Sequence, residues 1–255
     1  MADTKSVVSG SLEGLDVPAD IRQRISELRD DLAGAAGTNL RGLILYGGLA
    51  RGRYRAGKSD INVVVLLADT ATESLAAIAP VLRLAWRAVR VEPFILKASE
   101  ARRLAETFPT KLLDIQTHHI VLMGENPFAG IDVSRKLIRL RIEQSLTNLA
   151  LRLRRRYISI FDDPRSLAAT LAEQAVPLKV ELAALLQLAG KDEPSESTSA
   201  AVLESAAEEF DLDGEALRLV AALRRDGSPP EDLPALYDRA LATIERAAEI
   251  VSRME

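Results

Sequence analysis

The chain has 255 residues, of which 47% are hydrophobic and 27% charged, a composition that fits one large or two small globular domains and excludes a disordered or fibrous protein. It has no cysteine and only two histidines, which excludes disulfide frameworks, thiolate zinc sites and cysteine nucleophiles. The formal net charge of -4 and the scattered aromatic residues argue against dedicated DNA or RNA binding, because phosphate neutralisation needs a basic excess. The chemistry must therefore come from carboxylates, amides, hydroxyls and arginines.

The N-terminal segment, MADTKSVVSGSLEGL, lacks the basic start, apolar core and cleavage site of a signal peptide. No segment has about 18 uninterrupted apolar residues, the length that a membrane span needs. We therefore expect a cytoplasmic protein with no membrane association.

The first 130 residues show a mixture of strand and helix patterns. β-type apolar runs occur at 42–48, 61–67 and 89–96, and a helical pattern starts at Thr72. That pattern places four apolar side chains on one face: Leu75, Ile78, Leu82 and Trp86.

From Ser134 onward only helical periodicity remains, which indicates a helical bundle. Pro177 predicts two helices or one kinked helix over 165–189, and the stretches 194–199 and 227–230 have the composition of loops. The first apolar stripe comprises Ile138, Ile142, Leu146, Leu149, Leu153, Tyr157 and Ile160, and the last comprises Leu233, Tyr237, Ala240, Ile244, Ala247 and Val251.

Charge is also divided unevenly in the C-terminal half. Residues 134–161 carry eight basic residues and one acidic residue, Glu143, whereas residues 192–215 carry nine acidic residues and no basic ones. Together with the change in periodicity, this distribution predicts two domains, 1–130 and 131–255.

The segment Leu43–Leu67 carries the most informative motif and admits two interpretations. Residues 52–59 read Gly-Arg-Tyr-Arg-Ala-Gly-Lys-Ser, which satisfies the phosphate-binding P-loop pattern. A P-loop needs a helix directly after it, but the residues that follow, Asp-Ile-Asn-Val-Val-Val-Leu-Leu, have the composition of a strand. The P-loop NTPase is therefore the disfavoured alternative.

The second interpretation takes the whole unit: a strand, Gly47-Gly48, ten intervening residues, and Ser59-Asp60-Ile61-Asn62 opening a second strand. This unit resembles the nucleotidyltransferase superfamily of the DNA polymerase β type, including the aminoglycoside nucleotidyltransferases and the minimal nucleotidyltransferases of toxin–antitoxin pairs. The resemblance implies an α+β fold: an N-terminal mixed sheet with flanking helices, followed by an all-α helical bundle.

The residues of the unit also suit nucleotide chemistry. Two glycines let the backbone approach a triphosphate, and we expect a helix from about Ala50 to Arg55 to offer its amides there. Alternate positions of a strand point to one face, so Asp60 and residue 62 converge. Glu92 lies where the resemblance places a third acid. Asp60 and Glu92 are thus the candidate ligands of Mg²⁺.

The sequence departs from the family pattern at Asn62, where the family has the second acid of Asp-x-Asp. An amide offers a neutral oxygen in place of a carboxylate that bridges two metals. Three explanations stay open: a natural pseudoenzyme, an enzyme that uses one metal, or a substitution introduced to trap substrate. We assign Asp60, Asn62 and Glu92 as the candidate catalytic set.

The candidate triphosphate-binding residues are Gly47, Gly48, Arg51, Lys58 and Ser59. Arg51 is the first choice among the basic residues of the loop because it lies nearest the glycines. A set of solvated loop charges is the competing interpretation.

Three further groups are weaker candidates. The adjacent His118 and His119 point in two directions, which favours a structural role over a shared metal site. The arginines 152 and 154–156 either meet phosphate or form the solvated face of a helix. Lys179 and Glu181 occupy a region where the resemblance implies phosphate and base groups.

The sequence as a whole predicts a protein that binds a nucleoside triphosphate, with ATP the first choice, and Mg²⁺. The resemblance implies transfer of a nucleotidyl group to a hydroxyl of a small molecule, a protein or an RNA end, with release of pyrophosphate. The alternative is a catalytically silent pseudo-nucleotidyltransferase that senses a nucleotide or binds a partner. Because related proteins often pair, a homodimer is one expected arrangement.

Overall fold

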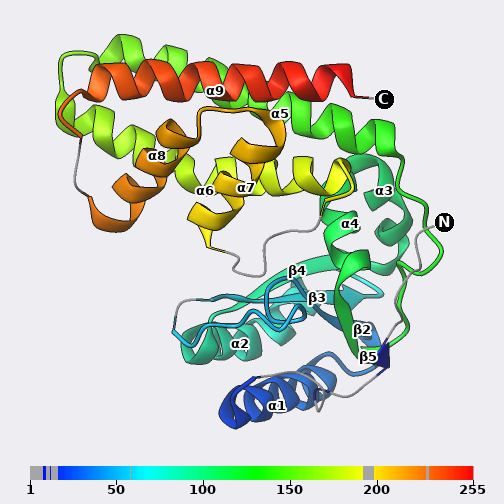
Figure 1. Ribbon diagram of the computed structural model, residues 1–255. Coiled ribbons are helices and arrows are strands. Elements are labelled where there is room, and N and C mark those ends of the chain that lie inside the picture. The colour runs from blue at the N-terminus through cyan, green and yellow to red at the C-terminus, as the bar shows by residue number, and fades with distance from the viewer. Residues whose placement is uncertain are drawn as a thin grey trace. The chain divides into compact units, whose positions relative to one another are not determined.

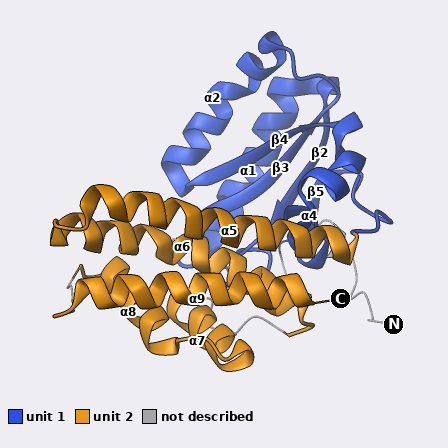
Figure 2. Ribbon diagram, turned by 90° about the horizontal axis from the view of Figure 1, so that it is seen from above, with its two compact units in different colours: residues 1–133 blue, residues 134–255 orange. Residues whose placement is uncertain are grey.

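The computed structural model describes residues 8–9, 12, 17–57, 59–191, 198–227 and 230–254 (Figure 1). The chain divides into two compact units, residues 1–133 and residues 134–255 (Figure 2). The first unit is built on a sheet, and the described part of the second is helical.

Unit 1 contains a five-stranded sheet in the order β1-β5-β2-β3-β4. The central strand β2 runs antiparallel to both β3 and β5, whereas β4 pairs parallel to β3 and β1 parallel to β5. The sheet is therefore mixed, as the α+β prediction requires, and β4 is an edge strand. The strands are β1 (Val8–Ser9), β2 (Leu40–Tyr46), β3 (Ile61–Leu67), β4 (Val91–Lys97) and β5 (His119–Gly124).

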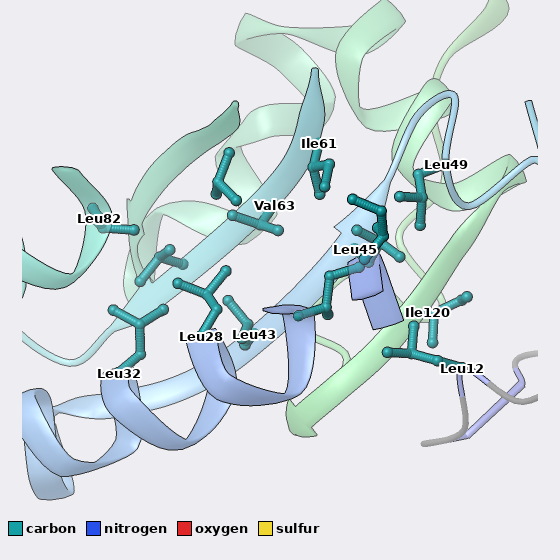
Figure 3. Packing of buried hydrophobic residues seen from close by; sticks show 14 of the residues in the cluster. Leu12, Leu28, Leu32, Leu43, Leu45, Leu49, Ile61, Val63, Leu82 and Ile120 are labelled. Carbon is teal, nitrogen blue, oxygen red and sulfur yellow. The ribbon is translucent and has the colours of Figure 1, made fainter. Parts of the chain in front are cut away.

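Helices α1 (Ala19–Ala36) and α2 (Thr72–Val89) cover one face of this sheet. Leu28 and Leu32 of α1 pack in the same cluster as Leu43 of β2, as Figure 3 shows. Strands β2 and β3 are apolar along nearly their whole length because both of their faces are covered.

The helix α2 begins at Thr72, where the sequence predicts it. Ile78 and Leu82 are buried on its inner face. Trp86 is a correction: its side chain is 43% exposed and does not continue the apolar stripe. It lies in the last turn of the helix, where its ring contacts the guanidinium of Arg90 instead.

The other face of the sheet is covered by the short helices α3 (Leu104–Thr107) and α4 (Pro109–Thr117). Leu112 and Ile115 of α4 pack with Ile44 and Val64 of the sheet. Two 3₁₀ turns, η2 (Gly37–Asn39) and η3 (Ala98–Arg103), connect neighbouring elements.

Strand β5 is an element that the sequence reading missed. It pairs with β2 through Gly42 and Gly124, where the two backbones come unusually close. A Cβ on Gly124 would lie 2.0 Å from the carbonyl oxygen of Arg41, and this glycine has a φ of +75°. Glycine is therefore required at Gly124 for the strand to end in this way.

Unit 2 is a set of packed helices. The first predicted apolar stripe is buried on α5 from Ile138 to Leu153, whereas Tyr157 is 36% exposed. All six residues of the last predicted stripe are buried on α9. The described helices of this unit are α5 (Arg135–Ile160), α6 (Pro164–Leu188), α7 (Ser199–Phe210), α8 (Gly214–Asp226) and α9 (Leu233–Arg253).

Pro177 lies inside the single helix α6. Of the two predicted alternatives, the division into two helices is therefore wrong and the single helix remains. Of the predicted loop at 194–199, residues 194–197 lie outside the described residues, and Thr198 caps α7. Gly227 ends α8 at the start of the second predicted loop, of which residues 228–229 are also outside the described part. No helix in the described residues is both long enough and apolar enough to cross a membrane.

Candidate functional site

A row of polar side chains crosses the sheet of unit 1 at one end of its strands. Asn62 of β3 pairs in register with Tyr46 of β2 on one side and with Glu92 of β4 on the other. Tyr46 pairs in turn with His119 of β5. Because directly paired residues point to the same face of a sheet, these four side chains share the face that α4 covers. The register thus brings together two predicted site residues, Asn62 and Glu92.

The turn after β2 lies against the side chain of Asn62, which belongs to the neighbouring strand β3. Gly47 has a φ of +74°, and a Cβ at this position would lie 3.0 Å from the amide nitrogen Nδ2 of Asn62. A Cβ on Gly48 would meet nothing within 4 Å. Gly47 is therefore needed for contact with Asn62, whereas Gly48 leaves its backbone accessible to a ligand.

The predicted helix from Ala50 to Arg55 does not form. Instead, the backbone N–H groups of Arg51 and Arg53 donate to the carbonyl oxygens of Gly47 and Gly48, at 3.1 and 2.8 Å. The residues after Gly52 leave this turn and form a loop. Four glycines within the eleven residues 47–57 favour turns over a helix here.

Ser59 closes that loop. Its backbone N–H donates to the carbonyl oxygen of Arg55 at 2.9 Å, and its hydroxyl accepts from the N–H of Arg55 at 3.0 Å. The strand β3 begins at Ile61, directly after this turn. The P-loop alternative is therefore wrong, because the helix that it needs after Ser59 is absent. Lys58, the lysine of that pattern, lies outside the described residues.

Arg51 is largely buried and anchors the glycine turn to α4. Its guanidinium donates a hydrogen bond to the Asp114 carboxylate, with 14% of the arginine side chain and 32% of the aspartate side chain exposed. The sequence predicts that Arg51 binds the triphosphate, but its guanidinium is already hydrogen-bonded to Asp114.

Lys111, one turn before Asp114 on α4, also reaches the sheet. Its ammonium nitrogen lies 4.5 Å from the ring centroid of Tyr46 and 5.6 Å from that of Phe94. Burial lowers the pKa of Lys111, and the charge of Asp114 partly opposes this shift. A cation therefore lies over the aromatic part of this face.

The polar row also perturbs Tyr46. Burial raises the pKa of its hydroxyl far above the ordinary value, and the charges of Asp114 and Glu92 raise it further. Tyr46 is consequently neutral at physiological pH. The same effect indicates that both carboxylates act on one small region of the sheet.

Asp60 lies directly before β3 and is paired with Arg90, directly before β4. The Arg90 Nε donates to the Asp60 Oδ1 at 2.7 Å, and both side chains are substantially exposed, 50% and 40%. The guanidinium of Arg90 also lies 5.7 Å from the ring centroid of Trp86. Asp60, the first predicted metal ligand, therefore already has a positive partner.

Glu92, the second predicted metal ligand, is exposed, and its side chain makes no hydrogen bond or ion pair within the described residues. No group of three or more His, Cys, Asp or Glu residues in the described part of the chain is placed to hold a metal ion. His119 forms a 2.8 Å contact from its Nε2 to the Nδ2 of Asn126.

The arginines of the second predicted basic group, on α5, divide into two sets. Arg154 donates to Glu245 at 2.8 Å, and Arg156 lies 3.7 Å from Glu173. Arg152 and Arg155 instead line a surface cavity together with Glu181 of α6.

Sequence reasoning did not identify Lys111 or Asp114 as part of this region. Both lie on α4, which shares the face of the polar row, but they are separated from Arg51 by about sixty residues of chain. Lys111 and Asp114 are three residues apart, which places them on one side of a helix. This spacing was the one sequence signal that could have indicated that they act together.

Comparison with known proteins supports the fold. No protein-family model matches the sequence, and no curated protein matches it either. The crystal structure of spectinomycin adenyltransferase AAD(9) from Enterococcus faecialis with ATP and spectinomycin is similar, with a TM-score of 0.54 and 14% identity. The similarity covers 88% of this chain and 98% of the adenyltransferase chain.

The chain therefore has the α+β fold of a nucleotidyltransferase, with a helical C-terminal region. The similar structure is that of an adenyltransferase solved with its nucleotide and a small molecule. At this identity the likeness defines the fold, and the activity has to be argued from the residues of the chain itself.

Proposed function

We propose that the chain binds a nucleoside triphosphate at the polar row of unit 1 and transfers its nucleotidyl group to an acceptor hydroxyl. The pairing of Asn62 with Glu92, beside the Gly47 turn, carries this proposal. It places an exposed carboxylate next to an amide at the head of β3, at the point where the chain turns through two glycines. The fold of an adenyltransferase solved with ATP supports the same reading.

ATP is the first choice of nucleotide, because the similar structure was solved with ATP. The accessible backbone at Gly48 would approach the triphosphate, with Ser59 and Lys58 of the following loop as further candidates. Arg51 would act indirectly, by fixing the turn against Asp114.

The carboxylates of Asp60 and Glu92 fit one Mg²⁺ better than a pair of them. Magnesium is commonly held by one or two carboxylates together with substrate phosphates. A bridged pair does not fit, because Asn62 supplies a neutral oxygen where a shared carboxylate is needed. When bound, Mg²⁺ would neutralise negative charge on the triphosphate and the departing pyrophosphate.

In the proposed reaction the acceptor oxygen forms a bond to the α-phosphorus, and the bond from that phosphorus to the α,β-bridging oxygen breaks. Pyrophosphate leaves and the hydroxyl proton is released. Asn62 would orient the triphosphate through its amide, since an amide both donates and accepts hydrogen bonds. A small molecule is the first choice of acceptor, by analogy with spectinomycin in the similar structure, ahead of a protein or an RNA end.

A catalytically silent nucleotide sensor is the second candidate. It is favoured by the Asp60–Arg90 pair at 2.7 Å, because the arginine competes with a metal for the carboxylate. Asn62 also favours the silent sensor, because its amide supplies a neutral oxygen where a carboxylate shared by two metals is needed. Action in the cytoplasm and assembly as a homodimer stay predictions.

A labelled-nucleotide transfer assay separates the two candidates. We expect the native chain with ATP and Mg²⁺ to label an acceptor, and Glu92→Gln to abolish labelling while the fold is retained by circular dichroism. Labelling by Asn62→Asp but not by the native chain would instead support the silent sensor. Absence of both ATP binding and labelling in the native chain and Asn62→Asp would contradict both candidates.

A further inference from the structure

Helix α5 carries a continuous polar stripe. Arg141, Ser145, Asn148, Arg152 and Arg155 follow one another at spacings of four, three, four and three, which places them on one face of the helix. All five line one surface cavity of about 440 Å³, whose other wall includes Glu181 of α6. The cavity is formed within unit 2.

The charges that line this cavity are unbalanced. Three guanidinium groups face a single carboxylate. Arg141 donates to the hydroxyl of Ser145 at 2.8 Å. Glu181 is half-buried, and burial raises its pKa while the Ser145 hydrogen bond and the Arg141 charge oppose the shift. The charges of Arg141 and Glu181 thus compensate each other.

Arg152 and Arg155, whose side chains are exposed, have no such compensation. Their side chains make no hydrogen bond or ion pair within the part of the chain that the structure describes. Other arginines of the same helix that lie outside the cavity are partnered: Arg139 with Glu143 at 3.0 Å and Arg154 with Glu245 at 2.8 Å. Among the arginines of α5, the two that have no partner in the described residues therefore both line the cavity.

We propose that the α5–α6 cavity binds a small phosphate ester, with Arg152 and Arg155 contacting the phosphate group. A guanidinium presents parallel N–H donors that match two phosphate oxygens, and two guanidiniums one turn apart suit a doubly charged anion. Asn148 and Glu181 offer an amide and a carboxyl for hydroxyl groups of the ester. The volume lies in the range of small-molecule sites. A cationic ligand is disfavoured by the three arginines.

This proposal does not depend on the proposed function, because no residue of unit 1 takes part in it. Nucleotides also carry phosphate, so the test must separate a simple ester from ATP. Ribose 5-phosphate and ATP serve as the two probes, and ribose serves as the control without phosphate.

The test is isothermal titration of the full chain at low salt. We expect ribose 5-phosphate to bind and ribose not to bind. Arg152→Gln and Arg155→Gln should each weaken ribose 5-phosphate binding about tenfold, since each removes one charged phosphate contact. The matched control Arg154→Gln removes the same charge from the same helix outside the cavity, and should change the affinity less than about twofold.

Failure of ribose 5-phosphate to bind the native chain would overturn the proposal. An equal loss in Arg154→Gln would also overturn it, because the effect would then come from net charge. If ATP alone bound through Arg152 and Arg155, the cavity would be a nucleotide site and the proposed ester would be wrong. Glu92→Gln of unit 1 should leave ribose 5-phosphate binding unchanged, which separates this proposal from the proposed function.

Discussion

The charged groups of the unit 1 sheet and those of the α5 cavity in unit 2 differ in their partners. In unit 1, Arg51 is bound to Asp114 and Asp60 to Arg90. In the cavity, Arg152 and Arg155 have no partner among the described residues. A charge with an internal partner can be explained by the fold alone, whereas unpartnered like charges gathered in one cavity are better explained by a ligand.

The same comparison identifies Glu92 within unit 1. Of the acidic residues near the polar row, Asp60 and Asp114 are paired, and Glu92 is the exposed carboxylate without an ion pair in the described residues. Glu92 therefore corresponds in unit 1 to Arg152 and Arg155 in unit 2, because each is a charged group without a partner in the described residues.

Arg51→Ala should destabilise the protein by about 2 kcal/mol, because it leaves the partly buried Asp114 carboxylate without its hydrogen bond. Urea unfolding measures the change. Arg55→Ala, an exposed arginine of the same loop, is the matched control and should cost less than about 0.5 kcal/mol. Equal effects of the two substitutions would show that the Arg51–Asp114 pair does not stabilise the fold.

Gly47→Ala should destabilise by about 1 kcal/mol, because alanine disfavours the left-handed conformation at a φ of +74°. It should also weaken ATP binding, since the added Cβ would displace the Asn62 amide. Gly57→Ala is the control: its φ is +71°, but its Cβ would meet nothing within 4 Å. Calorimetry should show the same backbone cost for both variants and weaker ATP binding for Gly47→Ala alone.

Glu181→Gln should raise the thermal midpoint near neutral pH. Burial raises the folded-state pKa of Glu181, so the native state is favoured when the carboxyl is protonated and loses stability as pH rises through that pKa. Glutamine does not ionise, so the variant does not have this loss of stability as pH rises. The difference between variant and native chain should therefore be present at about pH 7 and vanish at about pH 4. A lower midpoint for the variant at neutral pH would mean that its contact with Arg141 dominates.

Arg90→Ala should have the smallest effect on stability, less than about 1 kcal/mol, because the Asp60–Arg90 pair is exposed. It should strengthen Mg²⁺-dependent binding of ATP, since the Asp60 carboxylate is released from its partner. Arg87→Ala, which removes an exposed arginine of α2, is the control for the lost charge. Unchanged magnesium dependence in Arg90→Ala would count against Asp60 as a metal ligand.

Much of the fold could be predicted from local sequence. The apolar runs gave β2, β3 and β4, and the periodicity gave α2, α5 and α9, because the spacing of buried residues reflects the geometry of each element. Local signals left two alternatives open at α6, and only the structure shows that the helix continues through Pro177. They failed at 50–55, where the glycines favour turns.

The candidate site was predictable only in part. The motif placed Asn62 and Glu92 on two strands of one sheet, and the register pairs them directly. The sequence could not show that Arg51 binds Asp114 or that Arg90 binds Asp60, because these pairs depend on tertiary packing. The stripe from Arg141 to Arg155 was readable as helical spacing, but its relation to Glu181 depends on how α5 packs against α6.

Two titrations on three proteins test whether the unpartnered charges of the two units mark two separate binding sites. ATP with Mg²⁺ and ribose 5-phosphate are each titrated into the native chain, Glu92→Gln and Arg152→Gln. We expect Glu92→Gln to weaken only ATP binding and Arg152→Gln to weaken only ribose 5-phosphate binding. If either variant lost binding of both ligands, the assignment of separate sites to the unpartnered charges of the two units would be contradicted. The same would hold if both variants bound both ligands as the native chain does.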